Sequence, residues 1–240
     1  MLSARTLLFA SLCLSAQNTF ALGAGDIAFT ALNADEDGWA IVALTGLDAD
    51  STLYFSDSNW DGAAFSSAEG FHTWNTGGTA ISAGTVIRFS RIDQATRSVS
   101  AGTLSSTGSR ALSSTAETVY AYLGTAASSP LTFLAAVSTE ASAAAIAALT
   151  AAGLQSGVDA VILPASTDYA EYIGPRDGEV GFAAFRPLIN NAANWSGFTD
   201  GDHAAAQPGL VAFTVSAVPE VSGGWMMLAG LALVAARRRR

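Results

Sequence analysis

The chain has no lysine, a single cysteine and only two histidines among its 240 residues. All eleven basic residues are therefore arginines, and five of them lie in the two ends of the chain, at position 5 and at positions 237–240. Residues 25–216 carry six arginines against nineteen acidic residues. Such an acidic body excludes nucleic acid as a partner, because phosphate binding needs a basic surface. It is compatible with divalent cations and with neutral sugars.

The single cysteine, Cys13, lies in an N-terminal stretch with the features of a secretory signal. Arg5 precedes an apolar run at positions 7–16 that is too short to span a bilayer. Small residues suitable for a signal peptidase follow at positions 19–23. We expect residues 1–23 to be removed during export through the Sec route. The mature chain then has no thiol, which excludes disulfides, thiol catalysis and cysteine-based metal sites.

Sequence signatures of catalysis are also missing. The chain has no Gly-x-Ser-x-Gly motif, no phosphate-binding loop and no His-Glu-x-x-His motif. We interpret His72 and His203, which are far apart in sequence, as ordinary surface or half-buried residues, and Asp177 and Glu179 as solvated loop charges. A non-enzymatic protein is favoured. The alternative is a secreted hydrolase or a Ca²⁺-dependent binding enzyme, and clustering of both histidines with acidic residues in one pocket would favour it.

Short apolar runs separated by Gly, Ser, Thr and Asp predict a mainly β protein, with a single β-sandwich body at residues 25–216. The expected strands are residues 27–32, 39–44, 52–56, 85–89, 118–123, 131–137, 158–163 and 210–215.

Two short helices are expected to interrupt these strands. An alanine-rich helix at residues 140–152 would be capped by Ser138 or Thr139 and stopped by Gly153. Residues 182–189 include Pro187, which favours two short turns of helix over one continuous helix.

Two acidic turns have the spacing of calcium-binding loops. They are Asn33, Asp35, Asp37 and Gly38, and Asp57, Asn59, Asp61 and Gly62. Alternate oxygens in a tight loop can converge on Ca²⁺, but neither turn has the glutamate that usually closes such a site. The favoured interpretation is a turn whose side chains bond their own backbone. No cofactor is therefore expected, and a Ca²⁺ site at Asp57, Asn59 and Asp61 is the alternative.

Aromatic residues give a second kind of candidate site. Trp60 lies among the acidic residues of the second turn, and Trp74 lies shortly before a Gly-Gly turn. Aromatic rings can stack on the faces of sugars, but sandwiches also bury such rings in the core. Both alternatives are open for Trp60 and Trp74, whereas Trp39 is expected in the core.

The last segment of the chain, residues 217–240, differs from the body. Val218, Pro219 and Glu220 are followed by an apolar stretch at positions 221–236, which is marginal in length for crossing a bilayer. The chain ends with Arg237, Arg238, Arg239 and Arg240. Because such residues stay on the cytoplasmic side, we expect a short apolar transmembrane helix with the body outside.

This segment resembles a PEP-CTERM sorting signal of Gram-negative bacteria, with Val221 where a second proline is usual. The resemblance implies processing near Pro219 and Glu220 by an exosortase-type enzyme, after transient anchoring in the inner membrane. The processed protein would reach the cell surface or the extracellular matrix. The run at positions 222–224 also resembles a GlyGly-type tail, which a rhomboid-like protease handles.

The body resembles bacterial lamin-tail-like domains over residues 25–137. The similarity rests on the segments GDIAFTALNADEDGWAIVALTGL, LYFSDSNWDG, ISAGTVIRFS and ALSSTAETVYAYLG, in that order. It implies an Ig-like β-sandwich of the kind found in secreted surface proteins, and residues 138–198 extend beyond it. These features predict an exported, non-enzymatic protein that binds exopolysaccharide or envelope partners through loops at an end of the sandwich.

Overall fold

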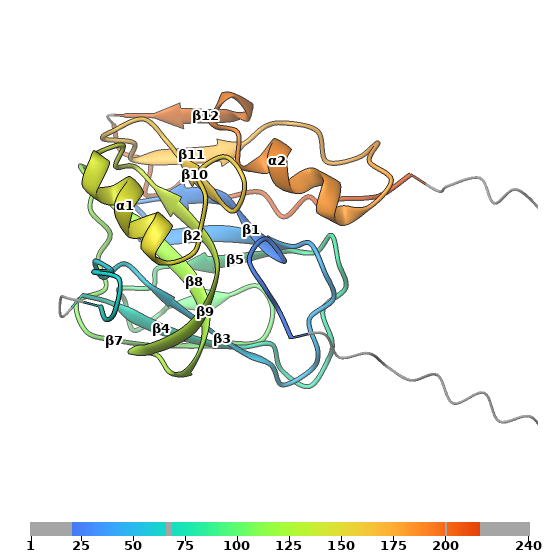
Figure 1. Ribbon diagram of the computed structural model, residues 1–240, viewed down its shortest axis with the longest axis horizontal. Helices are drawn as coiled ribbons and strands as arrows, with labels where there is room; N and C mark the ends of the chain where they lie inside the picture. Colours follow the sequence, from blue (N-terminus) through green and yellow to red (C-terminus); the bar gives the residue numbers. More distant parts are fainter. Residues whose placement is uncertain (1–20, 66–68, 200, 217–240) are drawn as a thin grey trace, which may run out of the picture.

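The computed structural model describes residues 21–65, 69–199 and 201–216, which fold into two six-stranded β-sheets (Figure 1). The first sheet has the order β12 (Trp195–Phe198), β11 (Tyr169–Tyr172), β1 (Ile27–Asn33), β2 (Gly38–Ala43), β5 (Val86–Ser90) and β6 (Ser98–Val99). The second has the order β10 (Ala160–Ile162), β9 (Ser129–Ser138), β8 (Thr118–Ala126), β3 (Thr52–Ser56), β4 (Phe71–Asn75) and β7 (Thr103–Thr107). Neighbouring strands are antiparallel except β9 and β10.

The prediction of a mainly β protein with short inserted helices is confirmed. Seven of the expected strands correspond to β1, β2, β3, β5, β8, β9 and β10. The expected strand at residues 210–215 is wrong, because the backbone there makes only an isolated bridge, between Val215 and Glu179. The sequence did not predict β4, β7, β11 or β12, nor the two-residue β6.

The helices lie close to their expected positions. Helix α1 covers Ala143–Ala151, and its N-cap is Ser142, whose hydroxyl accepts a hydrogen bond from the amide of Ala145. The expected caps Ser138 and Thr139 are instead buried at the end of β9. The second helical region divides as predicted, into η1 (Phe182–Phe185) and α2 (Arg186–Ile189). A further short turn, η2 (Ala192–Asn194), precedes β12.

The core between the sheets is built around aromatic rings. Trp39 on β2 and Phe89 on β5 face Phe55 and Trp74 on β3 and β4. The ring centroids of Trp39 and Phe55 are 5.3 Å apart, and those of Phe55 and Phe89 are 4.9 Å apart. These four side chains are fully buried. Their removal from water supplies much of the driving force for pairing the two sheets, because large aromatic rings carry the greatest apolar area.

The outer face of the second sheet is also covered. Helix α1 and the connection after β3 pack over β8 and β9, where Tyr120, Tyr122 and Phe133 form a second apolar cluster with Leu149 of α1. Trp60 and Phe65 of the connection pack against this cluster. The sheet therefore buries apolar side chains on both faces, which explains why β8 does not alternate strictly between apolar and polar residues.

The outer face of the first sheet is covered by residues 201–216, which we call the C-terminal strap. Strand pairing places Glu171, Ala31, Ala40 and Arg88 side by side across β11, β1, β2 and β5. Residues directly opposite in antiparallel strands share a face. The two alanines are fully buried beneath the strap, and Glu171 and Arg88 hold it from either side. Small side chains at the centre of this row leave room for the strap backbone.

The expected apolar helix near the C-terminus lies in residues 217–240, outside the described residues. Within the described residues, no helix is long and apolar enough to cross a membrane.

Replacing Ala40 by leucine tests this packing. The added carbons would push against the strap, so Ala40→Leu should lower the free energy of unfolding by about 1–3 kcal/mol. Ala147→Leu is the matched control, because Ala147 is exposed on α1 and should change stability by less than about 0.5 kcal/mol. Denaturant unfolding followed by tryptophan fluorescence measures both, and equal effects would contradict a tightly packed strap.

Candidate functional site

The two ends of the sandwich differ in chemistry. The first and last described residues, Ala21 and Ser216, both lie at one end, which we call the tail end (Figure 1). At the opposite end the connections 34–37, 91–97, 108–117 and 163–168 meet, and we call this the loop end. Backbone hydrogen bonds join these connections, including Ile92 N to Asp37 O at 2.9 Å and Ala34 N to Asp168 O at 2.7 Å.

The loop end gathers carboxylates that are shielded from water. Asp57 follows β3 and is 6% exposed, and its Oδ1 accepts a hydrogen bond of 2.6 Å from the amide of Gly70. Burial raises the pKa of Asp57 to about 7. The nearby Glu117 is also buried, and the loss of solvent raises its pKa to about 8 although its two oxygens accept hydrogen bonds from Ser113 N and Thr118 N.

Asp37 extends the same group from the turn between β1 and β2. Its Oδ1 accepts a 2.6 Å hydrogen bond from the amide of Leu112, which ties that turn to the connection before β8. Burial raises the pKa of Asp37 to about 6, and the neighbouring charges of Asp93 and Asp35 act in the same direction. Asp37, Asp57 and Glu117 thus form one electrostatically connected group, because the charges of Asp37 and Glu117 each interact with that of Asp57.

His72 lies beside this group on β4. It is fully buried, so the prediction of a surface or half-buried position is wrong for this histidine. Its Nδ1 is 2.8 Å from the Oγ of Ser106, and its ring lies edge-on to Trp39. Its Nε2 has no hydrogen-bond partner among the described residues. A Cβ at Gly70 would lie 2.9 Å from this Nε2 and 3.0 Å from Asp57 Oδ1, so only glycine leaves this space free. Burial lowers the pKa of His72 to about 3, which keeps the ring neutral.

His203 lies in a separate set of contacts in the strap. Its amide donates to Asp35 Oδ2 at 2.7 Å, and its ring packs against Tyr169 and Phe198. Asn33 donates to the carbonyl oxygens of His203 and Ala206. Within the described residues, the two histidines do not share a set of contacts, so the pocket that would have favoured the hydrolase alternative is not seen there.

The two predicted calcium-binding turns use several of their oxygens on backbone amides. In the first turn, Oδ1 of Asn33 accepts from the amides of Asp35 and Glu36. In the second, Oδ1 of Asp61 accepts from the amides of Ala63 and Ala64 at 2.8 and 2.7 Å. Among the described residues, no group of three or more His, Cys, Asp or Glu is arranged to hold a metal ion. A Ca²⁺ site at Asp57, Asn59 and Asp61 stays a prediction.

The two candidate stacking residues have different environments. Trp74 is fully buried, its Nε1 donates to the carbonyl oxygen of Ala101, and its ring packs against Phe55 and Phe89. This ring belongs to the core and presents no face to a ligand. Trp60 is half-buried and lines a surface hollow of about 360 Å³ together with Ala24, Pro130, Leu131, Thr132, Phe133 and residues 151–153.

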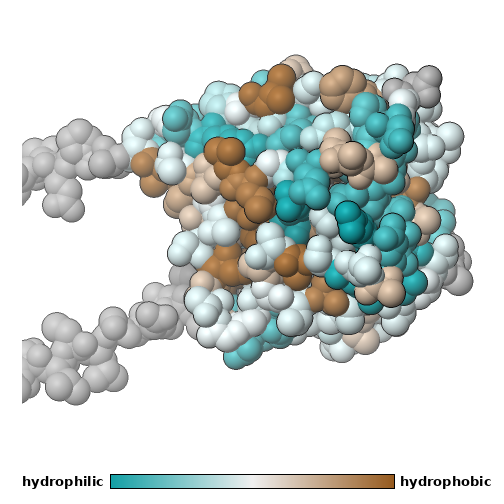
Figure 2. Space-filling view, turned by 180° about the vertical axis from the view of Figure 1, so that it is seen from behind, coloured by the Kyte–Doolittle hydropathy of each residue, from teal (hydrophilic) through white to brown (hydrophobic). Residues whose placement is uncertain are grey.

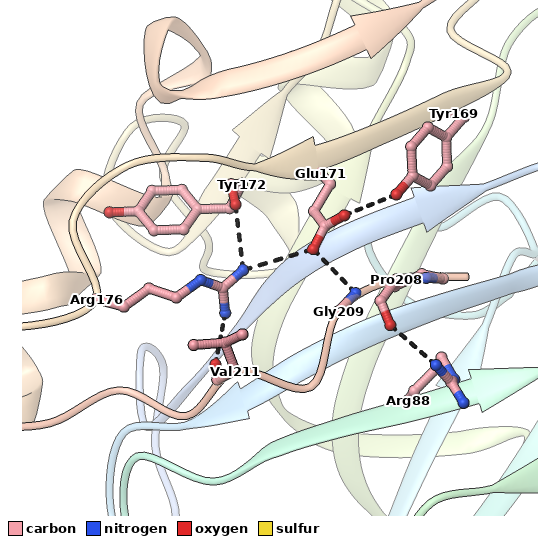
Figure 3. Close-up of polar contacts among 8 residues, drawn as sticks. All are labelled: Arg88, Tyr169, Glu171, Tyr172, Arg176, Pro208, Gly209 and Val211. Carbon is pink, nitrogen blue, oxygen red and sulfur yellow. Dashed lines mark hydrogen bonds and ion pairs between the residues drawn. The ribbon is translucent and has the colours of Figure 1, made fainter. Parts of the chain in front are cut away.

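The strap is a feature of the structure that the sequence did not reveal. At its centre, Oε1 of Glu171 accepts a 2.9 Å hydrogen bond from Gly209 N, and Nη1 of Arg88 donates to Pro208 O at 3.1 Å (Figure 3). Tyr169 donates its hydroxyl proton to the other carboxylate oxygen of Glu171 at 2.7 Å. The negatively charged Glu171 on β11 and the positively charged Arg88 on β5 therefore bind one amide group and one carbonyl group of the strap backbone.

Beyond this point the strap is held by Arg176. Its Nη1 donates to Val211 O at 2.8 Å and its Nη2 to Tyr172 O at 3.1 Å, while Nη2 lies 3.7 Å from Glu171 Oε1 (Figure 3). The guanidinium carbon lies 4.9 Å from the ring centroid of Phe213, a favourable cation–π distance.

The strap also contacts a tight turn at the tail end. The amide of Phe213 donates to Gly84 O, and Gly84 has φ +87 with its Cβ position only 2.3 Å from Phe213 O. Glycine is therefore required there. The last described contact is the 2.7 Å hydrogen bond from Ser216 N to Glu179 O.

Comparisons of this chain with protein-family models, with curated proteins and with solved structures found no match.

The raised pKa of Asp57 predicts a specific pH dependence. The folded state holds a proton on Asp57 more tightly than the unfolded chain, so this stabilisation is complete below about pH 4 and is lost as the pH rises to about 7. The lowered pKa of His72 has the opposite effect, because its stabilisation is lost as the pH falls below about 6.5. Asp57→Asn isolates the first effect, because asparagine cannot ionise and retains Oδ1 as an acceptor.

For each chain, the measured quantity is the free energy of unfolding at pH 8 minus that at pH 5. We expect this difference to be about 2 kcal/mol more favourable to folding in Asp57→Asn than in the parent chain. Asp61→Asn is the control in the same connection. The pKa of Asp61 is lowered, so this exposed carboxylate stays ionised between pH 5 and pH 8 in both states. Denaturant unfolding at the two pH values gives the result, and a variant with the pH dependence of the parent would show that Asp57 is not protonated in the folded protein.

Proposed function

We propose that this chain is an exported, non-enzymatic protein of the cell surface or extracellular matrix, delivered by its C-terminal segment. The observation that carries the proposal is the placement of both described ends of the chain at the tail end (Figure 1). A body tethered through residues 217–240 would present the loop end to the exterior. Loops held on a rigid sandwich are a common position for binding groups.

The proposed route follows from the order of segments along the chain. Residues 1–23 would act as a Sec signal, and residues 221–236 as a short transmembrane segment with Arg237, Arg238, Arg239 and Arg240 retained in the cytoplasm. An exosortase-type enzyme would process the chain near Val218, Pro219 and Glu220. The contact of Ser216 with Glu179 supports this site, because only Ala217 separates it from the proposed motif.

The ligand that we propose is a polysaccharide or an envelope partner. Trp60, Leu131 and Phe133 in the surface hollow offer apolar contacts of the kind that pack against the faces of sugar rings. The acidic body disfavours nucleic acid. On this proposal the two sheets belong to the Ig-like class of lamin-tail-like domains, with the strap and helices as additions to it.

A secreted hydrolase is the second candidate, and one observation favours it. The Oγ of Ser106 contacts His72, which lies near Asp57, so three residue types used in acyl transfer are close together. However, complete burial and a strongly lowered pKa leave His72 unable to accept a proton readily. The binding role is therefore the better-supported proposal.

Replacement of the proposed motif tests the sorting role. Pro219→Ala combined with Glu220→Ala should leave the chain uncut and in the membrane fraction, because alanine allows helix where proline keeps the backbone extended. The control is Pro175→Ala, a similar change in the folded body, and a chain that carries it should be processed normally. Mass spectrometry of the exported protein reports its C-terminus. Recovery from the medium of unaltered chain that still ends at Arg240 would refute the sorting proposal.

Replacement of the four terminal arginines by serine separates anchoring from cleavage. Carrying arginines across hydrocarbon costs several kcal/mol, so their loss should weaken retention of the C-terminus inside and reduce processing. Membrane fractionation and mass spectrometry measure the two effects. Unchanged fractionation and cleavage would show that the arginines do not hold the segment in place.

A further inference from the structure

Four exposed apolar side chains gather at the tail end. Ile173, Val180, Val211 and Val215 have exposed fractions of 67%, 74%, 65% and 38%. We call this group the exit patch. Isolated exposed apolar residues are normal on a protein surface, but a group drawn from two segments far apart in sequence needs an explanation.

Backbone and arginine contacts bring these two segments together. Nη1 of Arg176 donates to Val211 O, Thr214 N donates to Arg176 O, and Val215 forms a bridge with Glu179, the neighbour of Val180. Ile173 directly follows Tyr172, whose carbonyl oxygen also accepts from Arg176. The side chains of the exit patch therefore surround a common scaffold.

Arg176 does not make this surface polar. Its guanidinium is turned inward, over the rings of Tyr172 and Phe213, and its nitrogens are used on Val211 O, Tyr172 O and Glu171. The Arg176 side chain is thus only 16% exposed, while the valines and isoleucine of the exit patch are far more exposed. This arrangement is suited to an apolar or interfacial environment.

The position of the exit patch indicates its occupant. Val215 immediately precedes Ser216, the last described residue, and Figure 2 shows hydrophobic side chains close to the point where the upper grey trace leaves the body. Only four residues, 217–220, separate Ser216 from the apolar stretch that begins at Val221. At about 3.5 Å per residue, these four residues keep the tail end within roughly 18 Å of the start of that stretch.

We propose that the exit patch lies against the lipid surface into which the C-terminal segment inserts. This inference rests on the proposed membrane anchoring of residues 221–236. The patch would seat the body on the bilayer through its tail end, with the loop end directed away from the membrane. Contact with the interface would remove the exposed valine and isoleucine carbons from water, which is favourable in proportion to their area.

The charged residues near the exit patch indicate which lipid headgroups the patch would contact. Asp177 is exposed and Glu179 is half-buried in the same connection. Anionic headgroups would repel both carboxylates, so the proposed surface is rich in zwitterionic lipid.

A single fluorescent probe at Val180 tests the proposal on the mature chain, residues 24–240. This chain has no cysteine, so Val180→Cys can be labelled with an environment-sensitive dye after reconstitution into phosphatidylcholine vesicles. Nitroxide-labelled headgroups should quench this dye about threefold more than a dye at Ser114→Cys, an exposed position at the loop end. Equal quenching at the two positions in vesicle-bound chain would overturn the proposal.

Two further variants separate this inference from the anchoring on which it depends. Leu228→Arg with Leu233→Arg should abolish flotation of the chain with vesicles if residues 221–236 are the anchor. Unchanged flotation would show that the anchoring proposal, and with it the inference, is wrong.

Val180→Asp with Val211→Asp addresses the patch alone. It should retain flotation but reduce quenching of a dye at Ile173→Cys about threefold. Ile146→Asp, at a position that is 45% exposed on α1, is the control and should leave that quenching unchanged. A patch that contacts lipid predicts this difference, and identical quenching in the two variants would exclude it. Vesicles containing phosphatidylserine should give weaker quenching than phosphatidylcholine alone, and stronger quenching would contradict the proposed lipid.

Discussion

The binding of the C-terminal strap to the outer face of the first sheet is the interaction on which the other features depend. Glu171 and Arg88 hold one amide and one carbonyl group of the strap, above a row completed by the buried Ala31 and Ala40. Because the strap covers this face, β1 and β2 can be buried on both sides, and their apolar residues contribute fully to the hydrophobic stabilisation. Helix α1 and the connection after β3 give the second sheet an equivalent cover.

The path of the strap across the first sheet gives the two ends of the molecule different compositions. The strap runs from His203, near the loop end, to Ser216 at the tail end, which is also the end at which the first described residue, Ala21, lies. The acidic connections and the buried carboxylates of Asp57 and Glu117 then lie at the opposite end from Ala21 and Ser216, the first and last described residues. A sandwich with separate ends can be tethered at one end and leave its other surfaces accessible to partners, which is the arrangement that the proposed surface role requires.

The sequence predicted the parts of the fold in which local composition decides the structure. Apolar stretches gave β1, β2 and β5, and the alanine-rich segment gave α1. It did not predict β4 or β7, because His72 and Ser106 are polar residues whose burial or pairing depends on distant partners. The apolar residues at 210–215 resembled a strand, but their backbone groups bind Arg176 and Gly84 instead of a neighbouring strand. The grouping of Asp37, Asp57 and Glu117 likewise comes from connections separated by many residues, so no spacing in the sequence could reveal it.

The strap is the last part of the body to be synthesised, and this has a consequence for the timing of folding. Its contacts close very long loops, because Asn33 and Ala206 are separated by 173 positions in the sequence and Arg88 and Pro208 by 120. Until residues 201–216 emerge, the outer face of β1 and β2 has no cover, and the body cannot complete its structure. Completion of the fold is thereby postponed to the end of synthesis, and a chain that crosses a membrane unfolded would remain competent for translocation until nearly all of it had been made.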